Sequence, residues 1–386
     1  MGGQAFAKAG PNGSPLNVPR MPLETYEKMA AVVKTELEHI FRHVDFPREA
    51  PGKHDFGDID VLVEGSIGPW THQSIKEAIG GLYHLNHGGT HTYAVPHPDI
   101  TEAYVQVDVE ISPGNDTSAG PELFEWTMFM KSDSDLMQII GICHRSLGLT
   151  CNDKGFHVRV EQLEPYNKQK SLLFLTRDPD KAIAFYGLDV FKYKCGFETE
   201  DELFDWISQG QFFSRTMFRE RTEKANDRQR LRKRPMYGRF IEEYMPAHPE
   251  AGTDGREWTR EEVLGKALDT FQKHEQYHAM IKEHEIRENE MDLWRRIKEH
   301  LPLEGKSLGF ALKGLKRWVD FKDGQPYILS EPILEDHIIW SRVTSNEDQL
   351  MAWITLNYAQ VKALEKARSV SCSHDSVTES SKSAAL

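Results

Sequence analysis

Two aspartates, Asp58 and Asp60, lie one residue apart at the start of the apolar run Ile59-Asp60-Val61-Leu62-Val63. In an extended strand successive side chains alternate between the two faces, so both carboxylates point to the same face. Two adjacent carboxylates repel each other unless a cation lies between them, and oxygen ligands suit Mg²⁺. The pair therefore predicts a metal site, with two exposed aspartates at a turn after Gly57 as the alternative.

A third acid, Asp108, strengthens the first interpretation. Residues 104–111 alternate apolar and polar, which predicts a strand with Gln106, Asp108 and Glu110 on its polar face. Neighbouring strands are about 4.8 Å apart, so adjacent strands would bring three carboxylates to one pocket. Either Asp108 or Glu110 could be the third ligand. Two metals held in this way can clamp a triphosphate and activate an attacking hydroxyl.

The elements that must position these acids follow from periodicity and turn residues. Apolar residues at spacings of three to four predict a helix over 22–41, and a strand follows over 57–63. Longer helical patterns begin after Gly120 and continue to about residue 368. We therefore predict an α+β protein with a small mixed-sheet domain over 1–120, a larger, mainly helical domain over 121–368, and a serine-rich disordered tail over 369–386.

This order of motifs resembles the nucleotidyltransferase superfamily, the fold shared by poly(A) polymerases, CCA-adding enzymes and aminoglycoside nucleotidyltransferases. The family pattern is a Gly-Gly or Gly-Ser turn, a helix, Asp-x-Asp on a strand, and a later acid. The matching residues here are Gly2-Gly3, the helix over 22–41, Asp58-Ile59-Asp60 and Asp108. Residues 51–60 and 175–188 further resemble an uncharacterised viral, phage and fungal branch. The resemblance covers roughly residues 1–240.

The resemblance implies a role for each matching residue. Asp58, Asp60 and Asp108 would hold Mg²⁺ or Mn²⁺, with Asp108 facing the acceptor hydroxyl. Gly2 and Gly3 would let backbone N–H groups approach the triphosphate, because glycine has no Cβ to block that contact. The positive charges of Arg20 and Lys53 would contact phosphate; the alternative for both is an ordinary solvated cation. The helical domain would close one wall of the nucleotide cleft.

A second motif suggests different chemistry. His274-Glu275-Gln276-Tyr277-His278 has the His-Glu-x-x-His spacing that binds zinc on a helix, with the glutamate as general base. Charges recur on nearly every turn that follows, so a solvated helix is the favoured interpretation and a zinc protease the weaker alternative. The histidines between the two acidic strands have irregular spacing, and we expect them in a polar loop over the acidic site.

A basic segment stands out against the net charge of −13. Ten Lys and Arg residues lie between Arg215 and Arg239, against three acids, so the segment could contact an RNA or nucleotide backbone. The alternative is a solvated helix paired with acidic residues elsewhere. The chain has no apolar run long enough to span a membrane and no secretory leader, and its four cysteines form no Cys-x-x-Cys pair. We expect a cytoplasmic or nuclear protein.

Together these features predict a metal-dependent nucleotidyltransferase. It would move an NMP from an NTP such as ATP to an acceptor hydroxyl and release pyrophosphate. The acceptor could be RNA, a small molecule or a protein. The alternative from another class is a nucleotidyltransferase-like scaffold that binds a nucleotide or a partner without turnover.

Overall fold

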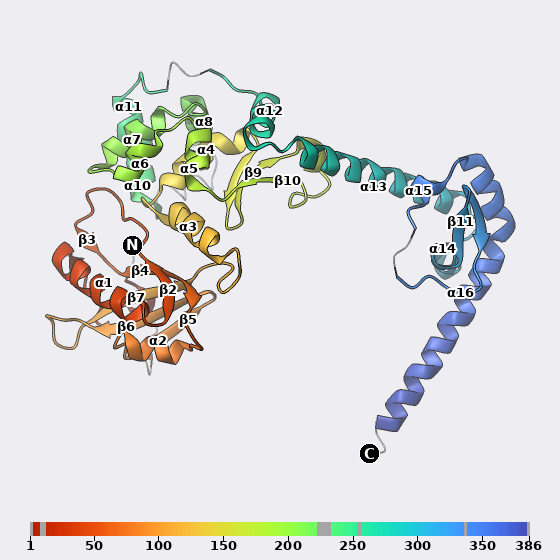
Figure 1. The fold of residues 1–386 in the computed structure, drawn as a ribbon, viewed down its shortest axis with the longest axis horizontal. Coiled ribbons are helices and arrows are strands. Elements are labelled where there is room, and N and C mark those ends of the chain that lie inside the picture. The colour runs from red at the N-terminus through yellow and green to blue at the C-terminus, as the bar shows by residue number, and fades with distance from the viewer. Residues whose placement is uncertain (1–2, 8–12, 222–232, 253–255, 336–337, 384–386) are drawn as a thin grey trace. The chain divides into compact units, whose positions relative to one another are not determined.

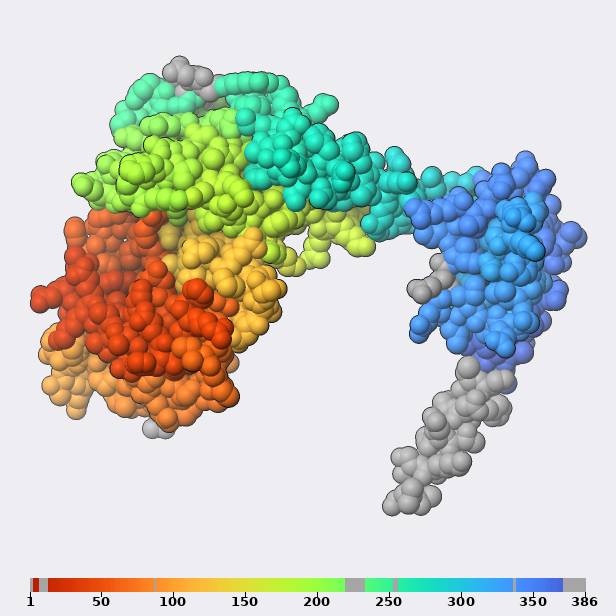
Figure 2. Space-filling view, viewed as in Figure 1, coloured from red at the N-terminus to blue at the C-terminus, as the bar shows by residue number. Residues whose placement is uncertain are grey.

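The computed structural model describes residues 3–7, 13–221, 233–252, 256–335 and 338–383, and it has the predicted α+β fold (Figure 1). The chain forms two compact units, Met1–Tyr277 and His278–Leu386. The sheet and the helices that follow it thus belong to one unit, whereas the sequence predicted a boundary at residue 120. In the space-filling view these residues, red to green, form one continuous body (Figure 2).

The first part of this unit is a five-stranded sheet with helices on its faces. Its elements are η1 (Ala5–Ala7), β1 (Met21–Pro22), α1 (Leu23–Leu37), β2 (Phe41–Asp45), β3 (Asp55–Phe56), β4 (Ile59–Ser66), α2 (His72–Ala78), β5 (Tyr83–His87), β6 (Thr90–Pro96), β7 (Tyr104–Ile111) and α3 (Gly120–Lys131). The strand order is β2-β4-β7-β6-β5. Only the β4–β7 pair is parallel, so the sheet is mixed.

One face of this sheet forms the hydrophobic core. Side chains alternate along a strand, so Val61 of β4 and Val107 of β7 point to the same side, where Val33 and Leu37 of α1 and Ile75 of α2 cover them. Each fully buried aliphatic side chain contributes about 1.5–3 kcal/mol. The opposite face carries the polar residues and is contacted by α3, which lies between the sheet and the later helices (Figure 1).

The second part of the unit is mainly helical. Its elements are α4 (Leu136–Ser146), β8 (Leu149–Asn152), β9 (Gly155–Arg159), η3 (Glu161–Leu163), β10 (Leu172–Thr176), α5 (Pro179–Phe185), α6 (Val190–Cys195), α7 (Glu200–Ser208), α8 (Arg215–Arg221), α10 (Pro235–Arg239), η4 (Phe240–Tyr244), α11 (Met245–Ala247) and α12 (Arg260–Phe271). Arg48, which follows β2, donates to the Tyr193 carbonyl (2.8 Å) and to Asp133 (2.7 Å). Such contacts explain why the two parts form one unit.

The second unit has its own core. Its elements are α13 (His274–His300, most of which lies in this unit), α14 (Gly305–Trp318), β11 (Val319–Lys322), β12 (Gln325–Ile328), α15 (Trp340–Val343) and α16 (Glu347–Ser383). Leu315 and Ile354 pack around the buried Trp340.

Three predicted boundaries differ from the structure. The helix predicted over 22–41 ends at Leu37, because Phe41–Asp45 pairs with β4 as an edge strand. Asp58 immediately precedes β4 rather than lying within it. The segment predicted as a disordered tail instead continues α16 to Ser383. Extending an existing helix adds one hydrogen bond per residue, which costs far less than nucleating a new helix.

Candidate metal and nucleotide site

The structure brings the predicted acids together on the polar face of the sheet. Asp60 of β4 is the register partner of Asp108 on the parallel neighbour β7. Register partners point to the same face, and Asp58, two residues before Asp60, lies on that side as well. Asp58 and Asp108 are half-buried, whereas Asp60 is exposed. The strand register therefore makes Asp60 and Asp108 neighbours on the same face of the sheet.

Asp58 is held by the N-terminal glycine turn. The backbone N–H of Gly3 donates to Asp58 Oδ2 at 3.1 Å. Gly3 has φ +81°, and a Cβ at this position would lie 2.3 Å from the Gly57 carbonyl oxygen. Only glycine permits this approach without strain. Gly3 thus reaches the acidic site across more than fifty residues of sequence, while Gly2 lies outside the described residues.

Asp108 is held by a residue to which the sequence analysis assigned no role. Gln106, also on the polar face of β7, donates from Nε2 to Asp108 Oδ2 at 3.0 Å. Its Oε1 accepts the backbone N–H of Ala5 at 3.0 Å. The N-terminal segment therefore contacts Asp58, immediately before β4, and Gln106 on β7. The alternation of apolar and polar residues along β7 predicted that Gln106 lies on this face. Nothing in that alternation indicated that the Ala5 backbone N–H would be its second partner.

The electrostatics of Asp60 reflect its crowded surroundings. Burial raises the pKa of Asp60 to about 7, with further contributions from Asp58 and Asp108, while Lys131 opposes them. Asp60 nevertheless keeps part of its surface in solvent, which screens its interactions with the neighbouring charges. Repulsion among the three carboxylates disfavours the fully ionised site, and a bound cation would relieve it.

Lys53 contacts an acidic side chain and an aromatic ring. Its Nζ is 2.5 Å from Glu49 Oε2 and 4.9 Å from the Phe56 ring centroid. Tyr26 stacks on Phe56 at 4.1 Å, and burial followed by Glu49 and Asp60 raises the Tyr26 pKa. Glu49 also contributes to the raised pKa of Asp60. It is therefore a fourth acid near the site, in a loop that gave no periodic signal.

Arg20 is oriented by a short strand pair. Met21 pairs with Phe56 and Pro22 with Asp55, which places Arg20 beside Asp55. Its guanidinium forms an ion pair with the Asp55 carboxylate and donates to the Asp55 carbonyl at 2.6 Å. Both side chains are largely exposed, so this pair contributes at most about 1 kcal/mol. A phosphate would have to compete with Asp55 for Arg20.

The structure separates Asp108 from Glu110 as candidates for the third ligand. Glu110 is the register partner of Leu62, two residues further along the strands than the Asp60–Asp108 pair. Its carboxylate forms an ion pair with Lys131 at the end of α3. Glu110 therefore already has a cationic partner, and the geometry favours Asp108.

The donor set suits a hard divalent cation, but the ligands are not yet arranged around one. In the part of the chain that the structure describes, no three His, Cys, Asp or Glu side chains form a ready metal-binding group. Two of the three aspartates are instead turned toward donors, Gly3 N–H and the Gln106 amide. Carboxylate oxygens are nevertheless the preferred ligands of Mg²⁺. Rotation of Asp58 and Asp108 would precede metal binding.

The His-Glu-x-x-His motif has no such setting. His274, Glu275 and His278 lie on α13 with exposed side chains. His274 Nε2 is 2.8 Å from Asp269 Oδ1, and within the described ranges no third ligand completes a metal-binding group. A zinc site needs a shielded pocket with supporting hydrogen bonds. The structure thus gives the zinc alternative no support.

Two of the histidines between the acidic strands, His84 and His91, lie within strands on the opposite face from the aspartates, so the expectation of a polar loop over the acidic site is wrong for these two. His84 pairs with Tyr93 across the β5–β6 hairpin, on the core side of the sheet. His84 Nε2 lies 3.1 Å from His91 Nδ1, and His72 of α2 stacks on His84 at 4.8 Å. Because side chains alternate between the two faces of a strand, pairing His84 with the core residue Tyr93 directs His84 away from the aspartates.

Three described cations of the basic segment have partners within the protein. Arg215 donates to the Met245 carbonyl at 2.6 Å, and Arg234 lies 2.6 Å from Asp135. Arg239 pairs with Glu200 and Asp201 at 3.1 and 2.9 Å. Residues 222–232, which include Arg228, Arg230 and Arg232, lie outside the described residues.

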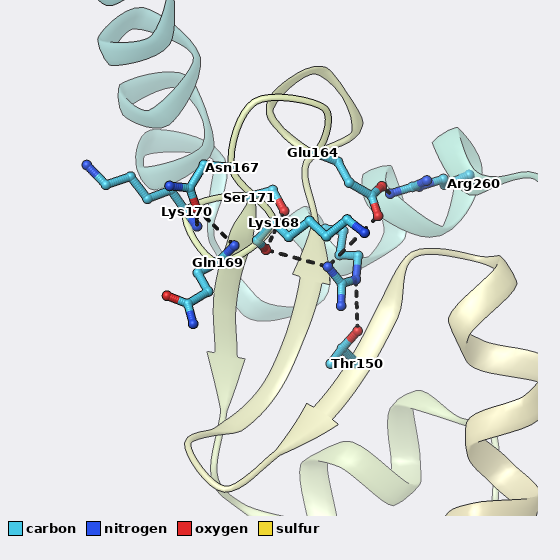
Figure 3. Close-up of polar contacts among 9 residues, drawn as sticks. Thr150, Glu164, Asn167, Lys168, Gln169, Lys170, Ser171 and Arg260 are labelled. Atoms are coloured by element: carbon cyan, nitrogen blue, oxygen red, sulfur yellow. Dashed lines mark hydrogen bonds and ion pairs between the residues drawn. The ribbon is translucent and has the colours of Figure 1, made fainter.

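A second polar cluster lies on the three-stranded sheet β10-β9-β8 (Figure 3). Asn167 Oδ1 accepts the N–H groups of Gln169 and Lys170 at 3.0 and 2.9 Å. Ser171 Oγ donates to the Lys168 carbonyl at 2.9 Å, and Arg260 pairs with Glu164 at the base of the loop. These groups bond to one another, so the cluster fixes the shape of a loop rather than forming a catalytic site.

No known protein family matches the chain, and no curated protein is similar to it. Across the described residues, no helix combines the length and the apolar character needed to cross a membrane.

Proposed function

We propose that this protein is a metal-dependent nucleotidyltransferase that moves an NMP from an NTP to an acceptor hydroxyl. The observation that carries the proposal is the Asp60–Asp108 register pair, with Asp58 beside it held by Gly3. Three carboxylates, from two segments about fifty residues apart, lie on the polar face of a mixed sheet. A purely structural role would instead favour apolar side chains or charges with opposite partners at these positions.

The reaction forms a bond between the acceptor oxygen and the α-phosphorus of the NTP and breaks the bond to the β-phosphate oxygen. Pyrophosphate leaves, and the hydroxyl proton leaves through the Asp108 carboxylate. Bound Mg²⁺ or Mn²⁺ would neutralise the triphosphate and lower the pKa of the hydroxyl. Asp58 and Asp60 would hold the metals. Lys53 would leave Glu49, and Arg20 would leave Asp55, to contact the phosphates.

The direct test is pyrophosphate release from each of the four NTPs with Mg²⁺ or Mn²⁺. Acceptors should include RNA, small hydroxyl compounds and the protein itself. Asp58→Asn and Asp60→Asn should each reduce the rate at least about 100-fold, because each removes a ligand charge. Release that persists unchanged in both variants would refute the proposed site. Nucleotide binding without any release would instead favour a non-catalytic scaffold.

RNA as acceptor has its own test, because the basic segment between Arg215 and Arg239 is the feature that suggested it. Each phosphate contact reduces the slope of log affinity against log salt by about 0.7 for a single strand. Replacing Arg228, Arg230 and Arg232 with glutamine should therefore weaken RNA binding and flatten its salt dependence. An unchanged slope would exclude this segment as the RNA contact.

A further inference from the structure

Gln106 is a buried amide whose two ends both have partners. Its side chain is 4% exposed and lies on β7, two residues before Asp108. The orientation of the amide follows from chemistry, because the Ala5 N–H can only donate and the Asp108 carboxylate, when ionised, can only accept. Oε1 must therefore face Ala5, and Nε2 must face Asp108. Both bonds are 3.0 Å long.

The N-terminal segment is fixed close to these contacts. Phe6 is fully buried, and its carbonyl accepts the N–H of Leu16 at 3.1 Å. Gly3 reaches Asp58, immediately before β4, while Ala5 reaches Gln106 on β7. The segment thus links the start of β4 to β7 near the carboxylates. Removing one partner of such a buried polar bridge lowers the stability of the folded protein, because the remaining polar groups stay buried without a hydrogen bond.

We propose that Gln106 is a positioning residue that couples the N-terminal glycine turn to the third carboxylate. Its amide sets the rotamer of Asp108 and anchors the backbone of Ala5, so the geometry of the turn and of the acid change together. Loss of this bridge removes one hydrogen bond from Asp108 and one anchor from the segment that carries Gly3. The expected effect of this bridge on catalysis rests on the proposed function. Its expected effects on metal binding and on hydrogen exchange at the Ala5 amide do not.

Gln106→Met tests the bridge, because methionine has nearly the same length and no comparable donor or acceptor. We expect an Mn²⁺ Kd about 10- to 100-fold weaker, as is typical when a group that orients a metal ligand is lost. The Mg²⁺ concentration for half-maximal pyrophosphate release should rise by a similar factor, while the KM for NTP at saturating Mg²⁺ changes little. Hydrogen exchange at the Ala5 amide should accelerate, whereas exchange in the centre of α1 should not.

Two further variants separate positioning from simple loss of stability. Ala5→Pro removes the N–H that Gln106 accepts and leaves Gln106 itself in place, at the first residue of η1 where proline is tolerated. It should weaken Mn²⁺ binding less than Gln106→Met does, because the bond from Gln106 to Asp108 remains. Gln73→Met, an exposed glutamine bonded to Glu77 on α2, is the matched control and should leave Mn²⁺ affinity and Ala5 exchange unchanged.

The outcomes are distinct. Wild-type Mn²⁺ affinity and wild-type Ala5 exchange in a folded Gln106→Met protein would overturn the inference and leave the proposed function standing. If Gln106→Met does not fold, Ala5→Pro decides, and wild-type metal affinity in that variant would likewise overturn the coupling. Wild-type protein that binds Mn²⁺ but releases no pyrophosphate would reject the proposed function, while the Mn²⁺ and exchange results still decide the bridge. Wild-type protein that binds no Mn²⁺ would overturn both.

Discussion

Asp60→Asn should stabilise the metal-free protein at alkaline pH, although it removes a residue proposed to be essential for activity. Burial and the charges of Asp58 and Asp108 raise the pKa of Asp60 from 3.8 to about 7. The folded protein therefore binds a proton more tightly than the unfolded chain. The resulting stability is fully present below about pH 4 and is lost as the pH rises through 7. Asparagine does not ionise, so the variant avoids this loss.

The size of the effect follows from the pKa shift and the exposure of Asp60. A rise in pKa from 3.8 to about 7 corresponds to about 4 kcal/mol for a fully enclosed group. Asp60 keeps solvent contact, and screening reduces this to about 1 kcal/mol in the free energy of unfolding. For a unit of this size, about 1 kcal/mol raises Tm by about 2–4 °C. We expect this gain at pH 8 and little difference at pH 4.

The assay is thermal unfolding in EDTA at intervals from pH 4 to pH 8. Asp99→Asn is a matched control, because Asp99 is an exposed loop residue whose Oδ1 lies 3.8 Å from Lys28 Nζ, and its Tm should follow that of the wild type. Saturating Mg²⁺ should then raise the Tm of the wild type more than that of Asp60→Asn. A variant that is equally or less stable than the wild type at pH 8 would refute the electrostatic reasoning.

Three further predictions concern the glycine turn, the third acid and the rival zinc motif. Gly3→Ala should reduce pyrophosphate release at least about 10-fold through its clash with the Gly57 carbonyl, whereas Gly13→Ala, with a similar positive φ but open space, should have little effect. Asp108→Asn should abolish pyrophosphate release. Glu110→Gln should lower it less than about 10-fold, because Glu110 is paired with Lys131. The reverse ranking would identify Glu110 as the third ligand. Elemental analysis should find no stoichiometric zinc, and a zinc content that falls in His278→Ala would contradict this.

The sequence alone predicted the α+β class, the polar face of the two acidic strands and the residues on it. Alternation with a period of two decides which side chains of one strand share a face, so Asp60 and Asp108 could be assigned from local pattern. Boundaries were less accurate, as the overlong first helix shows, because tertiary pairing converted its end into β2.

Only the tertiary structure decided which strands are neighbours and which distant groups complete the site. The parallel pairing of β4 with β7 sets Asp60 beside Asp108 and Leu62 beside Glu110, and no local signal fixes such a register. The same holds for Gly3 on Asp58 and Gln106 on Ala5, which join residues 55 and 101 positions apart. The sequence by itself determined which residues could form the acidic site. Long-range packing decided their partners, because those contacts depend on the whole sheet rather than on any one segment.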